Sequence, residues 1–421
     1  MSMTSRERLA ATLRHEQPDR VCVDFGGTAV TGMHVSIVDR LRRRVLGDQA
    51  YRVKVVEPYQ MLGEIDDELR EALGIDVVGS WAPRGMFGFP NTDWKPFTLF
   101  DGTEVLVPDG FAVTVDEKQD LLIHPEGDRT SPACARMPHG GHFFDAISRQ
   151  RPIVEEELDP ADNLEEFSLL SDADVQHFAR QAQRGAGMQK GVIVIAPGVA
   201  FGDIALVPAL WKKDPRGIRD VEEWYVSTAA RREYVEKVFE GQCAMGLKNL
   251  ERLAQAVGDN AQAAFVTGTD FGTQAGLFIS RRAYRELYMP FHKIINGYIH
   301  AHTPWKTFIH SCGCVVDLIP DFIEAGFDIL NPVQTSAAGM DPAWLKRTYG
   351  RDIVFWGGGV DTQKTLPYGT PDEVYREVRE RVALFNDGGG FVFNTVHNVQ
   401  ALVPVENVEA MFRALKESAA G

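Results

Sequence analysis

The sequence of 421 residues has few cysteines, no excess of basic residues and no long apolar segment. Its five cysteines are scattered and odd in number, without the spacing of a disulfide framework, which predicts a reducing, cytoplasmic location. Lysine and arginine number 44 against 59 acidic residues, and this argues against a nucleic-acid partner. No apolar run approaches the roughly 20 residues that span a bilayer. Residues 1–20 are polar, so we expect neither a membrane span nor a signal peptide.

Short apolar segments alternate with helical patterns along most of the chain. Eight of them have the apolar content of buried strands, at 20–25, 74–80, 191–197, 263–270, 306–310, 327–332, 352–357 and 390–395. Buried strands that alternate with helices pair in parallel, and eight such units close a (β/α)8 barrel. We therefore predict an α/β fold, a TIM barrel. A doubly wound open sheet is the alternative, but no G-x-G-x-x-G follows any of these strands.

The composition and the hydrophobic pattern of the sequence change between residues 81 and 151. Glycine, proline and aromatic residues are frequent there, and an Asp-Gly pair at 101–102 between two alternating segments predicts a hairpin. We expect one barrel domain over 1–421, with a β-rich insertion at 81–151 after the second strand. The segments 60–73 and 159–184 are predicted to be helices.

Polar side chains follow the predicted strands, at the end of a barrel where active sites lie. His310 and Cys312 stand two apart at the end of one strand, so both side chains point to the same side. Imidazole and thiolate suit zinc, and a catalytic zinc needs a third protein ligand. His397, after the eighth strand, is the candidate, with Asp270 and Asp361 as rivals. The alternative is that His310 and Cys312 only pack the barrel mouth.

The remaining candidates occupy the same end of the predicted barrel. Asp270 and Asp361 are the candidate catalytic residues, for proton transfer or substrate orientation, although Asp270 in a glycine-rich turn could equally cap backbone N–H groups. The candidate substrate-binding residues are Asp24, Asn331, Gln334 and Asn398.

Several segments resemble the uroporphyrinogen decarboxylase superfamily. They are FIHSCG at 308–313, DLIP at 317–320, GFDILNPVQ at 326–334, GGGVDTQ at 357–363 and VPVENV at 403–408. The resemblance covers most of 1–80 and 187–421, and implies a (β/α)8 barrel that is often dimeric. True decarboxylases of this superfamily carry arginines after the first strand, to hold the substrate carboxylates. This sequence has DFGGTA at 24–29, without arginine, which argues against the decarboxylase itself.

The other branch of the superfamily contains corrinoid-dependent methyltransferases, which bind zinc through a His-x-Cys pair and a distant cysteine. His310 and Cys312 match the pair, but no cysteine follows Cys314, and His397 stands about where the third ligand would lie. The resemblance implies a zinc-assisted methyltransferase that moves a methyl group between a small molecule and a corrinoid (cobalamin) protein. That corrinoid protein is a separate partner and carries the methylcobalamin. A metal-assisted decarboxylase or lyase of a small acid, and a non-catalytic barrel, are the alternatives.

Overall fold

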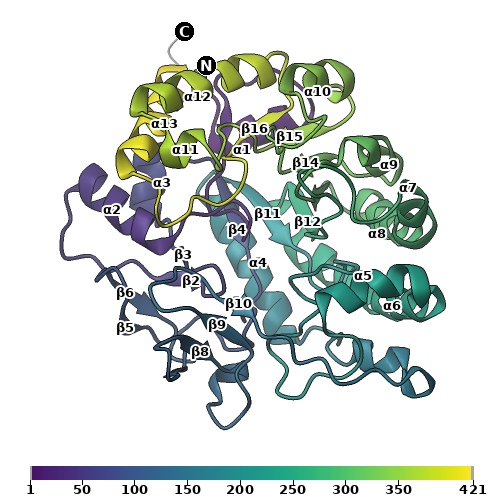
Figure 1. Cartoon of the computed structure of the whole chain (residues 1–421). Helices are drawn as coiled ribbons and strands as arrows, with labels where there is room; N and C mark the ends of the chain where they lie inside the picture. Colours follow the sequence, from purple (N-terminus) through teal and green to yellow (C-terminus); the bar gives the residue numbers. More distant parts are fainter. Residues whose placement is uncertain (1, 419–421) are drawn as a thin grey trace.

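A ring of eight parallel strands forms the centre of the molecule in the computed structural model, which describes residues 2–418 (Figure 1). The strands follow the order β1-β16-β15-β14-β13-β12-β11-β4. A hydrogen bond from Asp76 N to Val23 O, of 2.8 Å, joins the two ends of that order. The fold is thus an α/β TIM barrel, as predicted. Its strands are β1 (Cys22–Val23), β4 (Val77–Ser80), β11 (Gly191–Ile195), β12 (Ala263–Thr267), β13 (Lys306–His310), β14 (Ile329–Asn331), β15 (Val354–Trp356) and β16 (Phe391–Phe393).

Helices surround the strands, and capping residues fix where several of them begin (Figure 1). Thr4, Ser171 and Thr370 each form a capping box, in which the hydroxyl and an acidic side chain three residues later satisfy free backbone N–H groups. The helices are α1 (Ser5–Leu13), α2 (Val35–Leu46), α3 (Asp67–Leu73), α4 (Asp172–Gly187), α5 (Val221–Ala230), α6 (Arg232–Val257), α7 (Arg281–Ala283), α8 (Met289–His302), α9 (Ile319–Glu324), α10 (Pro342–Tyr349), α11 (Thr365–Tyr368), α12 (Pro371–Phe385) and α13 (Val405–Ser418).

Strand alternation divides the core into an inner and an outer layer. On β13, Phe308 packs with the apolar residues inside the barrel, whereas Ile309 belongs to the layer between strands and helices. Leu9 of α1 joins the inner cluster and is fully buried. Because side chains alternate along a strand, His310 shares the inner side with Phe308. The alternation therefore sends His310 toward the barrel axis.

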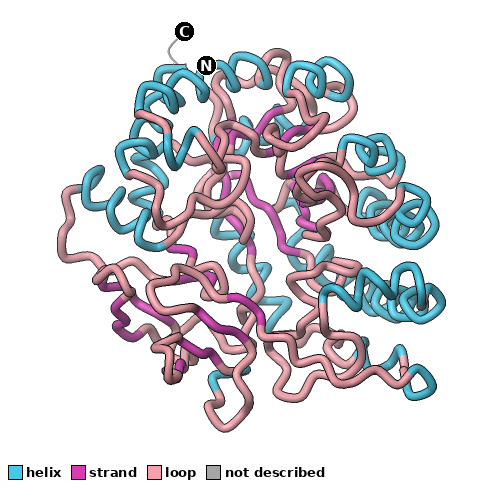
Figure 2. Tube along the Cα trace, in the orientation of Figure 1, coloured by secondary structure: helices cyan, strands magenta, loops and turns pink. Residues whose placement is uncertain are grey.

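Three small antiparallel sheets lie beside the barrel, on the side of α2 and α3 (Figure 1). Strands β2 (Val55–Glu57) and β3 (Leu62–Gly63) form one antiparallel pair, and Thr98 pairs with Glu104 in the predicted hairpin. Figure 2 shows long loops between these strands. The division into one barrel domain with an insertion at 81–151 stays a prediction. The strands after β4 are β5 (Lys95–Thr98), β6 (Glu104–Val107), β7 (Val113–Val115), β8 (Leu121–Ile123), β9 (Ala135–Met137) and β10 (Asp145–Ala146).

Two of the predicted helices begin later than expected. Strand β3 occupies the start of the segment 60–73, where Gly63 lies against α2 so closely that a Cβ would be 2.9 Å from Val35 Cα. In the segment 159–184, a short 3-10 turn at 160–164 precedes α4. Among the described residues, no helix has both the length and the apolar character that crossing a bilayer requires.

Candidate active site

His310 and Cys312 lie together at the carboxyl end of β13. His310 is the last residue of the strand and is buried, while Cys312 in the following turn is partly exposed. The distance from Cys312 Sγ to His310 Nε2 is 3.3 Å. Ligands on a tetrahedral zinc, with bonds of about 2.0 Å to nitrogen and 2.3 Å to sulfur, stand roughly 3.5 Å apart. The pair therefore has the spacing of two ligands of one ion.

His397 is the third member of this cluster, and it arrives from the loop after β16. The donor atoms of His310, Cys312 and His397 all lie within 4.8 Å of one another. Burial lowers the pKa of both histidines to about 4, so their rings are neutral at neutral pH and keep a lone pair. Burial, and then the nearby Asp270 carboxylate, hold the pKa of the Cys312 thiol well above its usual range. A divalent cation would offset that penalty on the thiolate.

The ring of His397 already makes one hydrogen bond. The backbone N–H of Asn398 donates to His397 Nδ1 at 2.8 Å, so the proton of the neutral ring is on Nε2. His397 must therefore give up this bond, or turn its ring, before it can bind a metal. His310 needs no such change, and Cys312 needs only to lose its thiol proton.

Asp270, in the loop after β12, lies against the same cluster. Its Oδ1 accepts a hydrogen bond from Cys312 N at 2.7 Å and is 3.9 Å from His310 Nε2. Burial raises the pKa of this carboxyl group. Tyr225 holds the loop, since its hydroxyl donates to Asp270 O at 2.6 Å. Asp270 thus lies beside the proposed ligands. It also orders the turn that carries Cys312.

Asp361 lies in a turn of its own. Its Oδ1 accepts hydrogen bonds from the backbone N–H groups of Gln363 and Lys364, at 2.6 and 3.1 Å. Among the described residues, the hydrogen bonds of its side chain are confined to this turn. Its catalytic role stays a prediction, without a contact to the cluster.

The predicted substrate-binding residues are engaged mainly with the protein itself. Asp24 is fully buried, and its two oxygens accept from Gly27 N and Trp356 Nε1. Burial raises the pKa of Asp24 to about 6. Gln334 Oε1 accepts from Gly313 N at 2.7 Å, which braces the turn after Cys312.

The amides of Asn331 and Asn398 are likewise bonded within the protein. Asn331 contacts His310, and Asn398 bonds to the backbone of Ala29 and to the side chain of Gln60. Substrate contacts by Asp24, Asn331, Gln334 and Asn398 therefore stay predictions, and each of these four residues has a structural task as well.

Sequence reasoning missed Asp203, a buried carboxyl group near Asp270. Burial raises the pKa of Asp203 to about 6, and the Asp270 carboxylate adds to the shift. Asp203 lies eight residues beyond the end of β11, in a long loop, so a search confined to the residues that follow each strand passes over it. Its proximity to Asp270 follows from how that loop folds back on the barrel.

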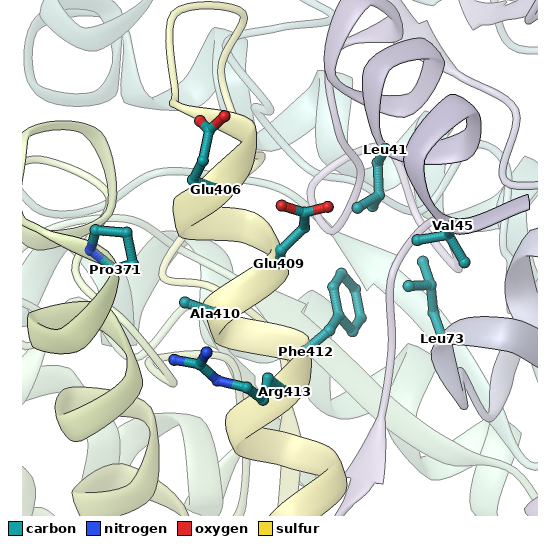
Figure 3. Close-up of a pocket in the computed structure, with 9 residues that line it drawn as sticks. All are labelled: Leu41, Val45, Leu73, Pro371, Glu406, Glu409, Ala410, Phe412 and Arg413. Atoms are coloured by element: carbon teal, nitrogen blue, oxygen red, sulfur yellow. The ribbon is translucent and has the colours of Figure 1, made fainter. Parts of the chain in front are cut away.

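A separate groove of about 460 Å³ lies among the outer helices, between α2, α3 and α13 (Figure 3). In Figure 3 the side chains of Leu41, Val45, Leu73 and Phe412 face one another, and Glu406, Glu409 and Arg413 lie along α13. None of the predicted site residues lines this groove. It is therefore distinct from the cluster at the barrel mouth.

The fold and the cluster define a (β/α)8 barrel protein with nitrogen and sulfur donors gathered at the carboxyl ends of its strands. Residues 233–418 match the uroporphyrinogen decarboxylase (URO-D) family, so the resemblance seen in the sequence is confirmed over this part of the chain. A solved "methyltransferase from Methanosarcina mazei" has a TM-score of 0.54 at 14% identity, with 99% of each chain covered. That likeness shows the fold.

Two kinds of curated relative match the chain. The "Methylated-thiol--coenzyme M methyltransferase" of Methanosarcina mazei is 26% identical over 194 residues, which are 41% of this chain and 49% of that protein. The uroporphyrinogen decarboxylase of Mannheimia succiniciproducens is 28% identical over 152 residues, or 35% of this chain and 40% of that protein. The matches thus span at most about half the length of these relatives.

Proposed function

We propose that this protein is a zinc-dependent methyltransferase that moves a methyl group between a small molecule and a corrinoid bound to a partner protein. The cluster of His310, Cys312 and His397 at the barrel mouth carries the proposal, because its donor atoms lie within 4.8 Å of one another. The match to a methyltransferase that acts on methylated thiols supports it. Dimerisation and a cytoplasmic location stay predictions.

The chemistry of the donor set fits zinc. His310 would hold the ion as it stands and Cys312 after its thiol loses a proton, and His397 would complete the set once its ring releases the N–H of Asn398. Bound zinc supplies Lewis acidity, which lowers the pKa of a thiol acceptor or polarises the heteroatom that loses its methyl group. Asp270 lies close enough to orient the substrate or take up its proton.

A metal-assisted decarboxylase or lyase of a small acid is the second candidate. Asp203 and Asp270 favour it, because buried carboxyl groups with raised pKa values can deliver a proton to a carbanion. The porphyrinogen itself is a poor substrate for this site. The loop after β1 has no arginine, and the carboxylate of Asp24 there is buried and hydrogen-bonded within the protein.

Metal analysis of the purified protein is the first test. We expect one zinc per chain, lost in His310→Ala and Cys312→Ser. Cys314→Ser is the matched control, because Cys314 is a nearby thiol outside the cluster and should keep the metal. A wild-type protein that takes up no zinc, or that keeps it in both ligand variants, would refute the proposed site.

Methyl transfer is then measured with free methylcobalamin and a thiol. The thiol sulfur gains the methyl carbon, and the electron pair of the broken methyl–cobalt bond stays on cobalt, which changes the corrinoid absorption. Turnover that needs zinc and Cys312 supports methyl transfer. Zinc binding without any methyl transfer, together with release of carbon dioxide from small acids, would favour the second candidate. Zinc binding with neither reaction would favour a non-catalytic barrel.

A further inference from the structure

Three neighbouring strands present inward-facing residues at one level of the barrel. His310 on β13 and Asn331 on β14 are directly paired. Asn331 is two residues after the inner residue Ile329, so its side chain points to the same side of the strand. Trp356, at the end of the next strand β15, is also in the inner cluster. All three are buried, Asn331 and Trp356 completely. Their polar groups therefore need hydrogen-bond partners within the protein.

The amide of Asn331 connects the other two residues. Its Nδ2 donates to the backbone carbonyl of Trp356 at 2.7 Å, and its Oδ1 is 2.5 Å from His310 Nδ1. A carbonyl oxygen can only accept, so the NH2 side of the amide must face Trp356. The oxygen of the amide then faces His310, and the hydrogen bond between them requires a proton on Nδ1.

The tautomer of His310 follows from this arrangement. With the proton on Nδ1, the lone pair is on Nε2, the atom that lies 3.3 Å from Cys312 Sγ. Metal-binding histidines generally donate their other ring N–H to an acceptor, which fixes both the ring orientation and the tautomer. Asn331 is such an acceptor.

The surroundings keep the Asn331 amide in this orientation. Trp356 is anchored on its far side, because its Nε1 donates to Asp24 Oδ2 at 3.0 Å. Gly357 follows with a φ of +100°, and a Cβ there would be 3.1 Å from Asn331 Nδ2. Glycine at this position thus permits both the backbone conformation and the close approach of the amide.

We propose that Asn331 is a positioning residue for the metal site, one that holds His310 with its Nε2 lone pair directed at the ion. The effect on metal binding rests on the proposed function. The tautomer of His310 does not depend on a bound metal. His397 offers an internal contrast. The N–H of Asn398 bonds to its Nδ1, so metal-free His397 carries its proton on the opposite nitrogen, Nε2.

The first experiment reads the tautomers directly, in the full-length metal-free protein. Long-range proton–nitrogen NMR correlations distinguish a ring protonated on Nδ1 from one protonated on Nε2. We expect the Nδ1–H form for His310 and the Nε2–H form for His397. In Asn331→Leu, His310 should become a mixture of tautomers while His397 stays unchanged. A wild-type His310 protonated on Nε2 would overturn the inference, whether or not zinc binds.

The second experiment measures zinc affinity by competition with a chromophoric chelator. Removal of such an acceptor typically weakens metal binding by roughly 10- to 100-fold, and we expect this range for Asn331→Leu. The matched control is Asn407→Leu. Asn407 is an equally buried asparagine, on α13, whose amide donates to the carbonyls of Leu366 and Gly369. Its loss should leave zinc affinity within about threefold of wild type. Equal affinities of the two variants would refute the role of Asn331.

Asn331→Asp provides a variant of the same shape, in case the leucine variant fails to fold. The oxygen that faces His310 still accepts from Nδ1, while the other oxygen carries a proton and donates to the carbonyl of Trp356, so the tautomer should be kept and zinc should remain bound. An aspartate variant in which His310 carries its proton on Nε2 would contradict the proposal. If wild-type protein shows the expected tautomers but binds no zinc, the proposed function fails and the inferred tautomer stands.

Discussion

Replacing Asp76 should destabilise the barrel without altering the metal cluster. Asp76 is fully buried just before β4, at the amino-terminal end of the ring. Its carboxylate accepts from Arg8 Nη1 at 2.6 Å, from both terminal nitrogens of Arg20 at 2.8 Å, and from Val23 N at 2.9 Å. These bonds tie α1, β1 and β4 together where the barrel closes.

The magnitude follows from what Asp76→Asn leaves behind. Removing one partner of a buried ion pair costs about 3–5 kcal/mol, because the other charge stays buried. Arg8 keeps a second partner in Asp19, at 2.7 Å, so we expect the lower end, about 3 kcal/mol. With an unfolding entropy of about 2.1 cal/mol/K per residue, this corresponds to a Tm lower by roughly 3–4 °C.

Thermal unfolding followed by circular dichroism measures this shift. Glu409→Gln is the control, since it removes an exposed pair with Arg44 and should cost less than about 1 kcal/mol. Zinc affinity of folded Asp76→Asn should equal that of wild type, because the cluster lies at the carboxyl ends of the strands. A Tm within 1 °C of wild type would refute the estimate. Loss of zinc binding would refute the claim that Asp76, at the amino-terminal end of the barrel, does not affect the cluster at the other end.

Two further predictions concern carboxyl groups away from the cluster. Burial raises the pKa of Glu57 from 4.5 to about 7, so between these values the folded state keeps a proton that the unfolded chain releases. This contribution makes stability fall as pH rises from about 4.5 to 7, and Glu57→Gln should flatten that part of a denaturation series; an unchanged slope would contradict the assignment. Asp361→Ala removes the cap on the turn at Gln363 and Lys364, and should cost about 1 kcal/mol with zinc affinity unchanged. A large loss of activity in this variant, at full stability, would instead support the predicted catalytic role of Asp361.

The barrel and the His-x-Cys pair could be predicted because both depend on local patterns. Eight apolar segments separated by helices define the parallel ring, and a spacing of two at the end of the predicted strand indicated that His310 and Cys312 lie on one side. His397 and Asp270 were also predicted as site residues because each follows a strand, and the carboxyl ends of all eight strands meet at one rim. The late start of the helix expected at 60–73 was not predictable this way, because β3 forms only through its pairing with β2.

The sequence by itself determined the barrel, its rim and the residue types that gather there, because periodicity and strand ends are properties of neighbouring residues. Only the tertiary structure decided what each polar group does. Asn331 is turned toward His310 by the carbonyl of Trp356, 25 residues away, and Asp203, in a long loop, lies against Gly268, two residues before Asp270. Hydrogen bonds between distant segments leave no trace in local sequence, and here they fix the proton on His310 and hence the atom available to a metal.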